Sequence, residues 1–420
     1  MGKILYRIGI GLYGFLVRTL SLFNEKAKLF AKGRKGWEAN LQEALAGNTK
    51  ETVWFHCASL GEFEQARPVI EKYKEEFPNT FLLVTFFSPS GYEIRKDYDQ
   101  ADYVCYLPLD TPANAQKFVE TISPSLVFFV KYEFWYFYLQ AIHQRNIPLI
   151  SFSAIFRPEQ LFFKSYGGFY RQSLHFFSHF FVQDKTSVEL LKSIGIENTT
   201  QSGDTRYDRV KEVFDQRKEI PLAKAFKNGV KTLVIGSSWP QDIEAIAEMY
   251  KQFEQPLKLL IAPHEIGESN IKAVEKAFAG YKTTRYSEAN IDEVANSEIL
   301  IIDNIGMLSS LYQYGEFAFI GGAFEQGLHN TLEAATYGVP VFFGPEYVKF
   351  QEAFDLIDCG GGFSIKNGED FLAQFSELYE NEKAWGKAAK ASFDLVRKNV
   401  GATEKVIAFS KSLSPSTKVQ

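Results

Sequence analysis

Short apolar runs alternate with amphipathic helical stretches along most of the chain, and this alternation constrains the fold more than any other feature. The strand candidates are 52–58, 81–87, 126–130, 148–153 and 180–182, then 232–236, 258–262, 298–302, 317–321 and 339–343. Helical patterns lie between or after several of them, notably 63–76, 186–194, 242–253 and 270–278. Such apolar runs separated by helices are typical of strands in parallel sheets. The sequence therefore predicts the α/β class.

A polar stretch, 204–227, contains no clear strand and separates two similar halves. A length of 420 residues suits two or three domains at roughly 150 residues each. We predict a segment 1–36, an N-terminal domain 37–220 and a C-terminal domain 221–420, with helices from Gly368 to Ser412 broken at Gly401. Two Rossmann-like halves predict a cleft in which ligands meet the carboxyl ends of the strands.

Composition excludes several classes of protein. Hydrophobic residues make up 45% and charged residues 23%, which is typical of a globular protein and not of a disordered, collagen-like or polytopic membrane protein. A net charge of −5 leaves no basic surplus for nucleic acid. The three cysteines lie far apart, which favours a reducing compartment over a disulfide framework. The six histidines are scattered, so we expect no metal site.

Residues 1–36 are strongly basic. They carry eight Lys or Arg and one Glu, a net charge of +7, and the remaining chain carries −12. Their apolar run, 8–17, is shorter than the about 20 residues that span a bilayer. A signal peptide is a poor fit, because Arg7 interrupts the apolar stretch and no cleavage site follows. A GxGxxG motif at Gly9, Gly11 and Gly14 has no strand before it, which argues against dinucleotide binding.

Helical spacing separates two sides of this segment. One side carries Ile4, Ile8, Leu12, Phe15, Leu16, Leu20 and Phe23, and the other carries Arg7, Gly11, Gly14, Arg18, Ser21 and Glu25. A basic amphipathic helix of this kind is expected in the membrane interface, on the anionic cytoplasmic side. The alternative is a core helix with a basic rim.

Three charged residues in the first half are candidates for chemistry. Glu62 follows the first strand as a possible general base, but Ser59 and Glu62 also have the spacing of a capping box. Glu133 follows a buried strand among aromatic residues, either as a poorly solvated functional carboxylate or as a surface Glu. Arg206 is suited to clamp a phosphate, or to form a salt bridge in a turn.

The second half offers two candidate anion sites after strands. At 236–241, Ser238 and Gln241 again have capping-box spacing at the start of a helix. At 319–335, a glycine turn precedes a helix expected to begin near Asn330, where backbone N–H groups suit a phosphate and Glu333 suits ribose hydroxyls. The alternative is an Asn330/Glu333 cap with glycines that serve close packing.

The motifs WFHCASLGE (54–62), GDTRYD (203–208) and the run GG…GLHNTLEAA…GVPVFFGP (321–345) resemble those of the 3-deoxy-D-manno-octulosonic acid (Kdo) transferases. The similarity extends from the N-terminal segment to about Ser364. It implies a two-domain glycosyltransferase of GT-B type with the two domains facing a cleft. It further implies a metal-independent enzyme without a cofactor, which transfers Kdo from CMP-Kdo to a lipid A precursor in lipopolysaccharide biosynthesis. The family works at the cytoplasmic side of the cell inner membrane, in contact with its lipids.

The resemblance also implies roles for particular residues. Glu62 matches the proton acceptor and Glu133 the glutamate that supports the transition state, while Arg206 stands where the family commonly has lysine. Cytidine and phosphate contacts map to Pro263 and His264, to Ile305, Gly306 and Met307, and to Asn330, Thr331, Leu332 and Glu333. Two segments differ from the family: Pro-His-Glu at 263–265 replaces Pro-Arg-His, and KYEFWY at 131–136 replaces ETELWP.

Two other functions fit parts of the same pattern. The second half suits any nucleotide, so another GT-B enzyme, a UDP-sugar transferase or epimerase, is the nearest alternative. A non-enzymatic ligand-binding protein at the membrane is a second alternative, and it has no need of Glu62 or Glu133. The sequence indicates no nucleic-acid partner and no particular protein partner.

Overall fold

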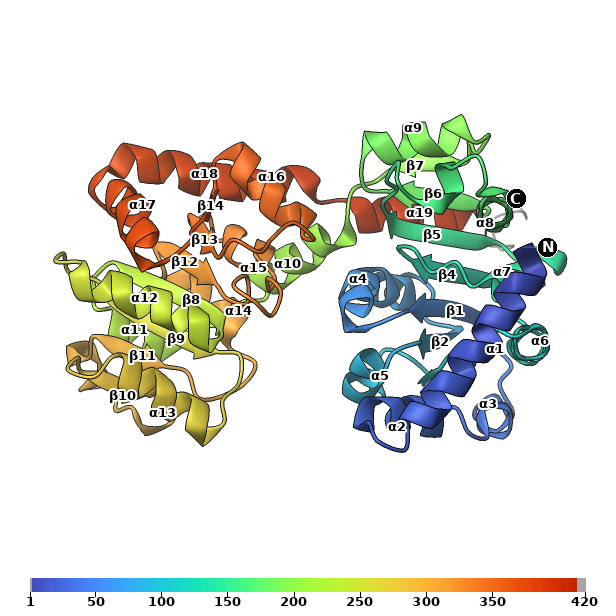
Figure 1. The fold of residues 1–420 in the computed structure, drawn as a ribbon, viewed down its shortest axis with the longest axis horizontal. Coiled ribbons are helices and arrows are strands. Elements are labelled where there is room, and N and C mark those ends of the chain that lie inside the picture. Colours follow the sequence, from blue (N-terminus) through green and yellow to red (C-terminus); the bar gives the residue numbers. More distant parts are fainter. Residues whose placement is uncertain (1, 414–420) are drawn as a thin grey trace. The chain divides into compact units, whose positions relative to one another are not determined.

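The computed structural model describes residues 2–413 and contains two compact units, each built around a seven-stranded parallel sheet (Figure 1). Within the described residues, unit 1 comprises 2–209 and 400–413, and unit 2 comprises 210–399. The predicted α/β class with two parallel-sheet domains is confirmed.

The sheet of unit 1 has the strand order β3-β2-β1-β4-β5-β6-β7. Its strands are β1 (Glu51–Cys57), β2 (Thr80–Phe86), β3 (Tyr103–Tyr106), β4 (Leu126–Val130), β5 (Leu149–Ala154), β6 (His179–Val182) and β7 (Thr199–Gln201). The order reverses between β1 and β4. In open parallel sheets, ligands bind outside the carboxyl ends of the strands at such a reversal.

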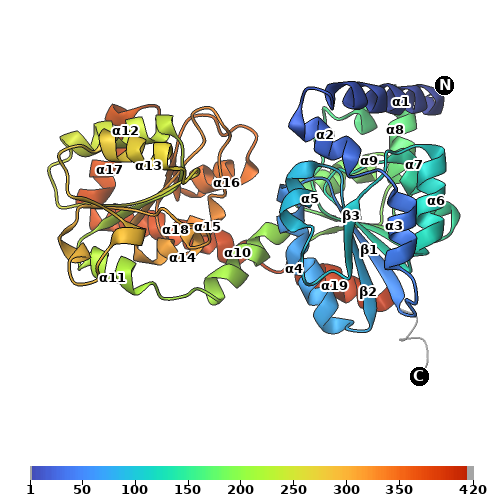
Figure 2. The same ribbon diagram turned by 90° about the horizontal axis from the view of Figure 1, so that it is seen from below.

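Helices cover both faces of this sheet (Figure 2). One face packs on α4 (Leu60–Glu76) and α19 (Ala402–Leu413), and the other on α3 (Trp37–Ala44), α6 (Pro112–Ile122) and α7 (Tyr136–Gln144). The other helices are α1 (Gly2–Leu20), α2 (Glu25–Lys32), α5 (Pro89–Arg95), α8 (Gly168–Leu174), α9 (Lys185–Ser193) and, across the boundary between the units, α10 (Thr205–Asp215). Neighbouring strand residues such as Trp54 and Phe55 belong to opposite cores, because side chains alternate across a strand.

Unit 2 repeats the architecture with the strand order β10-β11-β9-β8-β12-β13-β14. Its strands are β8 (Thr232–Ser238), β9 (Lys258–Pro263), β10 (Thr283–Arg285), β11 (Ile299–Ile301), β12 (Phe317–Ile320), β13 (Val341–Phe343) and β14 (Gly362–Ser364). Its helices are α11 (Pro221–Lys227), α12 (Pro240–Gln252), α13 (Glu268–Ala277), α14 (Leu308–Leu311), α15 (Leu332–Ala335), α16 (Gln351–Cys359), α17 (Gly368–Glu380) and α18 (Glu382–Asn399). The reversal lies between β8 and β12.

The observed units correct the predicted domain bounds at both ends. Residues 210–220 belong to unit 2, and the last helix, α19, belongs to unit 1 and not to a C-terminal domain 221–420. The reason is packing: Val406 and Ile407 are buried in the core formed with α4 and β1. Asp208 further holds the start of this helix, because its carboxylate accepts the N–H groups of Gly401 (2.6 Å) and Thr403 (2.7 Å).

Helix α1 rests on unit 1 through a narrow inner side, and residues 1–36 are therefore not a separate segment. Tyr6 donates a hydrogen bond of 2.7 Å to Asp110 and packs against Phe137 and Phe169. Gly14 is buried, and a Cβ atom there would lie 2.8 Å from Leu109. The predicted apolar side faces outward, so the alternative of a core helix is wrong. Within residues 2–413, no helix is long and apolar enough to cross a bilayer.

Candidate active site

Glu62 and Glu133 lie at the strand-order reversal of unit 1. Glu62 is in the first turn of α4, which follows β1, and Glu133 follows β4. Since β1 and β4 are adjacent and parallel, the two carboxylates are carried to the same edge of the sheet. Lys131, directly after β4, has φ 57°, a left-handed conformation that L residues avoid and that clusters at functional sites.

Glu62 is not held by the capping box that its spacing suggested. Ser59 is the N-cap residue of α4, but its side chain makes no capping hydrogen bond to the backbone. Its hydroxyl instead donates to the carboxylate of Glu62. This carboxylate is half-buried in the first turn of a helix, where the helix dipole favours negative charge.

Glu133 is held by one hydrogen bond and lies beside a buried histidine. Its side chain is 17% exposed, its Oε2 accepts the indole N–H of Trp135 at 2.6 Å, and the same atom lies 3.4 Å from Nε2 of His56. His56 is fully buried on β1. The alternative of a surface glutamate is therefore wrong.

The hydrogen bonds around His56 indicate which ring nitrogen carries the proton. The indole N–H of Trp54 donates to Oγ1 of Thr85 at 2.8 Å, and that hydroxyl lies 2.8 Å from Nδ1 of His56 but 3.5 Å from the carbonyl of Phe55. The hydroxyl of Thr85 therefore donates its proton to Nδ1 of His56, the nearer acceptor. This assignment leaves the imidazole proton on Nε2, facing Glu133.

Arg206 lies at the start of α10 and forms an ion pair with Asp204 (Nε to Oδ2, 3.1 Å). Asp204 is buried and also accepts both the backbone N–H of Arg206 (2.9 Å) and the amide of Gln65 (2.8 Å). Burial opposes ionisation of Asp204, but the charges and hydrogen bonds of these groups and the charge of Lys131 together lower the pKa of its carboxyl. Asp204 therefore remains ionised and orients the guanidinium.

The electrostatics of neighbouring side chains place Glu62, Glu133 and Arg206 in one region. The pKa of the Tyr132 phenol is raised, first by burial and then by Glu62 and Asp204, against the opposing charge of Arg206. The pKa of the Cys57 thiol is raised by burial and by both Glu62 and Glu133. Unit 1 thus brings together all three catalytic candidates of the sequence.

The corresponding edge of unit 2 carries a cluster of three rings. His264, after β9, packs against both Trp239 (centroids 4.5 Å apart) and His329 (4.6 Å). The indole of Trp239 donates to Nε2 of His329 at 3.1 Å, and since an indole N–H only donates, that nitrogen is unprotonated. Burial and the nearby His264 lower the pKa of His329 to about 4.

The turn after β12 needs glycine because another part of the backbone approaches it closely. A Cβ atom at Gly321 would lie 2.4 Å from the carbonyl of Ser237, and Gly322 has φ 96°. Asp242 ties this turn to α12, because its Oδ2 accepts the N–H groups of Trp239 (2.8 Å) and Gly322 (2.9 Å). The Ser238/Gln241 capping box is therefore wrong: α12 begins after Trp239, and Asp242 closes its first turn.

The helix expected from Asn330 is a single turn, α15, beginning at Leu332. Asn330 caps it, because its Oδ1 accepts the N–H of Leu332 (3.1 Å) and its amide donates to Glu333 (3.1 Å). His329, beside Asn330, lies next to His264, so the segments 263–264 and 330–333 come together. The segment 305–307 follows β11 at the same edge, and Ile305 there is 85% exposed.

Several buried polar atoms at this edge have no hydrogen-bond partner among the described residues. They are Oγ of Ser238, Oδ1 of Asp242, Oδ1 of Asn304 and Oγ1 of Thr331. Buried polar groups are normally satisfied, so these atoms are suited to a polar ligand. Among the described residues, no group of three or more His, Cys, Asp or Glu side chains is arranged to hold a metal ion.

The sequence analysis named His264 but missed its two ring partners, Trp239 and His329, and the residues that hold the carboxylates. His56 and Thr85 read as ordinary residues of apolar strands, and only the strand register pairs them. Trp135 and Asp204 stand within the motifs that were singled out, so a search for a hydrogen-bonding partner two residues from Glu133 and from Arg206 would have found them.

Comparison with known proteins identifies the relatives of this chain. A family model described as 3-deoxy-D-manno-octulosonic-acid transferase matches residues 33–209. The chain is 27% identical over 345 residues to the 3-deoxy-D-manno-octulosonic acid transferase of Aquifex aeolicus, covering 80% of this chain and 88% of the relative. It is 28% identical over 375 residues to that of Chlamydia trachomatis serovar D, covering 85% of each.

Among solved structures, a putative UDP-N-acetylglucosamine 2-epimerase from Listeria monocytogenes superposes with a TM-score of 0.60 at 16% identity, covering 87% of this chain and 96% of that one. The UDP-GlcNAc 2-epimerase of Neisseria meningitidis gives 0.59 at 16% identity, covering 85% and 98%. These likenesses concern the fold, which is GT-B-like. In sequence, the chain is similar to the 3-deoxy-D-manno-octulosonic acid transferases, and residues 33–209 are the part that the family model matches.

Proposed function

We propose that this protein is a glycosyltransferase that moves Kdo from CMP-Kdo to a hydroxyl of a lipid A precursor in lipopolysaccharide biosynthesis. The proposal rests on its homology to Kdo transferases and on one observation above all. Glu62 and Glu133, the two carboxylates that the family's motifs single out, lie at the β1/β4 reversal of unit 1, where an acceptor is expected to bind.

In the proposed reaction, Glu62 removes the proton of the acceptor hydroxyl while that oxygen attacks the anomeric carbon of Kdo. The bond from that carbon to the phosphate of CMP breaks on the opposite face, and CMP leaves with the bonding electrons. Glu133, oriented by Trp135 and His56, stabilises the positive charge that develops on the sugar. Arg206, oriented by Asp204, offsets the charge of the leaving phosphate. No metal or cofactor is expected to take part.

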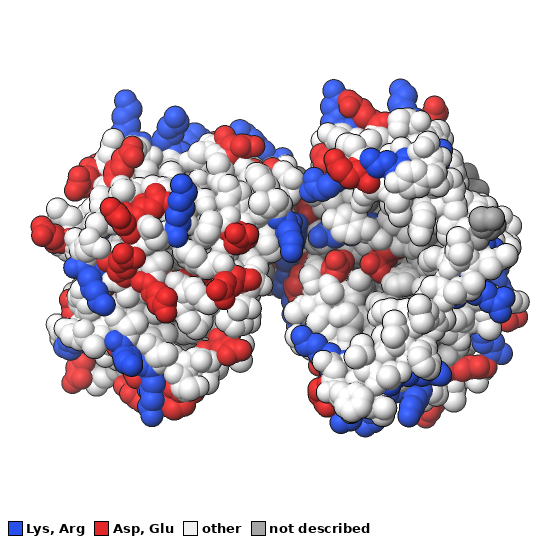
Figure 3. All heavy atoms as spheres, in the orientation of Figure 1, with Lys and Arg blue, Asp and Glu red and all other residues white. Residues whose placement is uncertain are grey.

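We further propose that α1 and the turn after it place the enzyme on the cytoplasmic face of the inner membrane. Nine large apolar side chains there are between 49% and 87% exposed: Ile4, Leu5, Ile8, Leu12, Phe15, Leu16, Leu20, Leu22 and Phe23. In Figure 3, the part of unit 1 over which α1 runs is largely free of charge, and Lys and Arg gather beside it toward α2. An apolar helix face bordered by basic residues is typical of interfacial helices.

The decisive experiment incubates purified protein with CMP-Kdo and a lipid A precursor. We expect CMP release coupled to a gain of one or more Kdo residues on the lipid, unchanged by EDTA. Turnover of a UDP-sugar instead would favour another GT-B enzyme. Absence of CMP release from folded, donor-binding protein would favour a non-enzymatic binding protein.

A further inference from the structure

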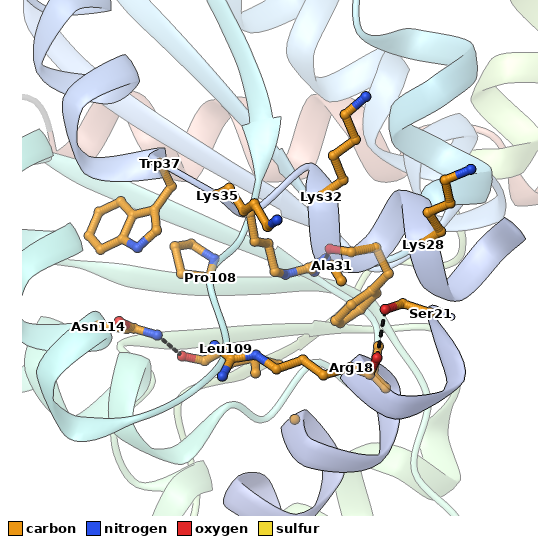
Figure 4. A pocket seen from close by; sticks show the side chains of 14 residues that line it. Arg18, Ser21, Lys28, Ala31, Lys32, Lys35, Trp37, Pro108, Leu109 and Asn114 are labelled. Carbon is orange, nitrogen blue, oxygen red and sulfur yellow. Dashed lines mark hydrogen bonds between the residues drawn. The ribbon is translucent and has the colours of Figure 1, made fainter. Parts of the chain in front are cut away.

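A cavity of 760 Å³ in unit 1 lies between α1, α2, the start of α3 and the loop that follows β3. Five cationic side chains line it: Arg18, Lys28, Lys32, Arg34 and Lys35. No Asp or Glu is among its lining residues. Figure 4 shows Arg18 alongside Leu109, Lys35 near Trp37, and Lys28 and Lys32 extending from α2 at the rim.

Arg34 forms a fixed part of the wall. Its guanidinium donates to the carbonyls of Leu107 (2.8 Å), Phe87 (2.6 Å) and Phe30 (3.0 Å), and its Cζ lies 3.5 Å from the centre of the Phe30 ring. Burial lowers the pKa of Arg34 to about 10, so the group remains charged at neutral pH. Because these bonds occupy three of its five N–H groups, Arg34 contributes positive charge more than direct contacts.

The other cations have no carboxylate that would neutralise them inside the cavity. Lys28 pairs with Glu25 (3.2 Å) in an exposed ion pair on α2. Arg18, Lys32 and Lys35 form no ion pair within the described part of the chain. Like charges gathered around one cavity repel one another, and an anion between them relieves that repulsion.

We propose that this cavity binds a phosphate group carried by an anionic lipid headgroup, with Arg18 and Lys35 as its principal ligands. A phosphomonoester carries about −1.5 to −2 charges near neutral pH, and a guanidinium binds it through two parallel hydrogen bonds. A lipid is favoured over a free ion because the cavity adjoins the outward apolar face of α1. Phe15, three residues before Arg18 and therefore its neighbour on the helix surface, is 66% exposed, and Leu22, in the turn that follows α1, is 75% exposed, so both are in position for the acyl region. The inference rests on the membrane placement proposed above, but not on Kdo transfer.

The test compares two double variants of the full-length protein with the same change of charge. Arg18→Gln with Lys35→Gln removes two ligands of the cavity. Arg7→Gln with Lys26→Gln removes two exposed charges of the same segment that do not line it. Binding to phosphatidylcholine vesicles containing phosphatidic acid is measured by co-sedimentation. We expect the cavity pair to raise the apparent Kd at least roughly ten times more than the control pair, because charge-assisted bonds are lost in addition to diffuse attraction.

An equal effect of the two pairs would overturn the proposal, since diffuse attraction alone would then account for binding. The source of the phosphate is tested with inorganic phosphate alone by titration calorimetry. Saturable binding of inorganic phosphate as tight as that of vesicles, and lost with the cavity pair, would assign the site to the free ion and overturn the lipid assignment. Kdo transfer to an acceptor dispersed in detergent reports separately on the proposed function. Both double variants should have the same thermal unfolding midpoint as wild type, which shows that the comparison concerns folded protein.

Discussion

At the scale of single residues, the carboxylate of Glu62 is held by very little. It accepts the hydroxyl of Ser59, and among the described residues no backbone N–H group and no cation binds it. Glu62→Gln keeps the shape of the side chain but cannot accept a proton. We expect kcat for Kdo transfer to fall by about 10²- to 10⁴-fold, the usual cost of removing a general base, with CMP-Kdo binding unchanged. Steady-state kinetics and donor titration measure the two effects.

The matched control is Glu64→Gln, two residues further along α4. Glu64 pairs with Arg95 (2.7 Å) and lies 3.9 Å from Arg209, so these ion pairs give its carboxylate a structural role. Its variant is expected to turn over within a few-fold of wild type. Near-normal kcat in Glu62→Gln would show that the carboxylate is not the base.

His329 gives the edge of unit 2 at the carboxyl ends of its strands a defined pH dependence. Its pKa falls from an ordinary value of 6.5 to about 4, because the folded protein buries the ring next to His264. The unfolded chain therefore binds the proton more readily, so the stability that this group contributes is present above about pH 6.5 and is lost as pH falls toward 4. Protonation of Nε2 also removes the acceptor for Trp239.

In His329→Gln, the amide oxygen can still accept the indole N–H, but the side chain does not titrate. We expect thermal unfolding of this variant to depend less on pH between 6.5 and 4 than that of wild type. An unchanged pH dependence would show that His329 is protonated equally in both states. Arg206→Lys, in the other unit, should leave this profile as in wild type.

The candidate site could be predicted from sequence only in part. Glu62 and Glu133 were found because each lies within five residues of the end of an apolar strand, and the carboxyl ends of parallel strands share an edge. The ring cluster of Trp239, His264 and His329 joins residues up to 90 positions apart, which no local pattern encodes. The positions of Arg206 and Asp204 were visible as a motif, but their ion pair was not.

At the scale of secondary structure elements, the four strands that the sequence analysis missed are β3, β7, β10 and β14. These are the edge strands of the two sheets. Each has only three or four residues, such as Thr-Thr-Gln in β7. An edge strand has a neighbouring strand on one side only, so its other side does not require apolar residues. The central strands were predicted because burial on both faces demands continuous apolar runs. The sequence analysis also assigned α19 to the second domain, because this helix follows unit 2 in the chain although it packs on unit 1.

Helix α19 yields a prediction about which unit it stabilises. Ile407 is 1% exposed in the core that α19 forms with α4. Ile407→Ala should destabilise unit 1 by about 2–5 kcal/mol, the usual cost of such a buried truncation, and leave unit 2 unchanged. Denaturant unfolding followed by hydrogen exchange resolves the two units. The exposed Glu404→Ala serves as control, and loss of protection in unit 2 instead would contradict the observed assignment of α19.

At the scale of the whole molecule, the outward helix and the candidate active site belong to one continuous packing arrangement of unit 1. The ring of Tyr13 on α1 stacks on Phe87 (6.2 Å between centroids), and Phe87 stacks on Trp135 (4.3 Å). Trp135 in turn donates to Glu133. A membrane-bound α1 would therefore hold the acceptor side of unit 1 close to the headgroups, where the sugar of a lipid acceptor lies.

The membrane proposal can be tested without disturbing this packing. Ile8, Leu12 and Phe15 are 57% to 66% exposed, while Tyr6 and Gly14 make the inner contacts. Each outward side chain contributes roughly 1.5 kcal/mol or more when it leaves water, so replacing all three by serine should weaken vesicle binding at least about a hundred-fold. The variant should move to the soluble fraction and bind CMP-Kdo like wild type. Serine at Ile94, Ile291 and Val348, which are 49% to 76% exposed, removes as many apolar side chains away from α1 and should leave vesicle binding intact. Equal binding by both triple variants would mean that α1 serves only the structure of unit 1.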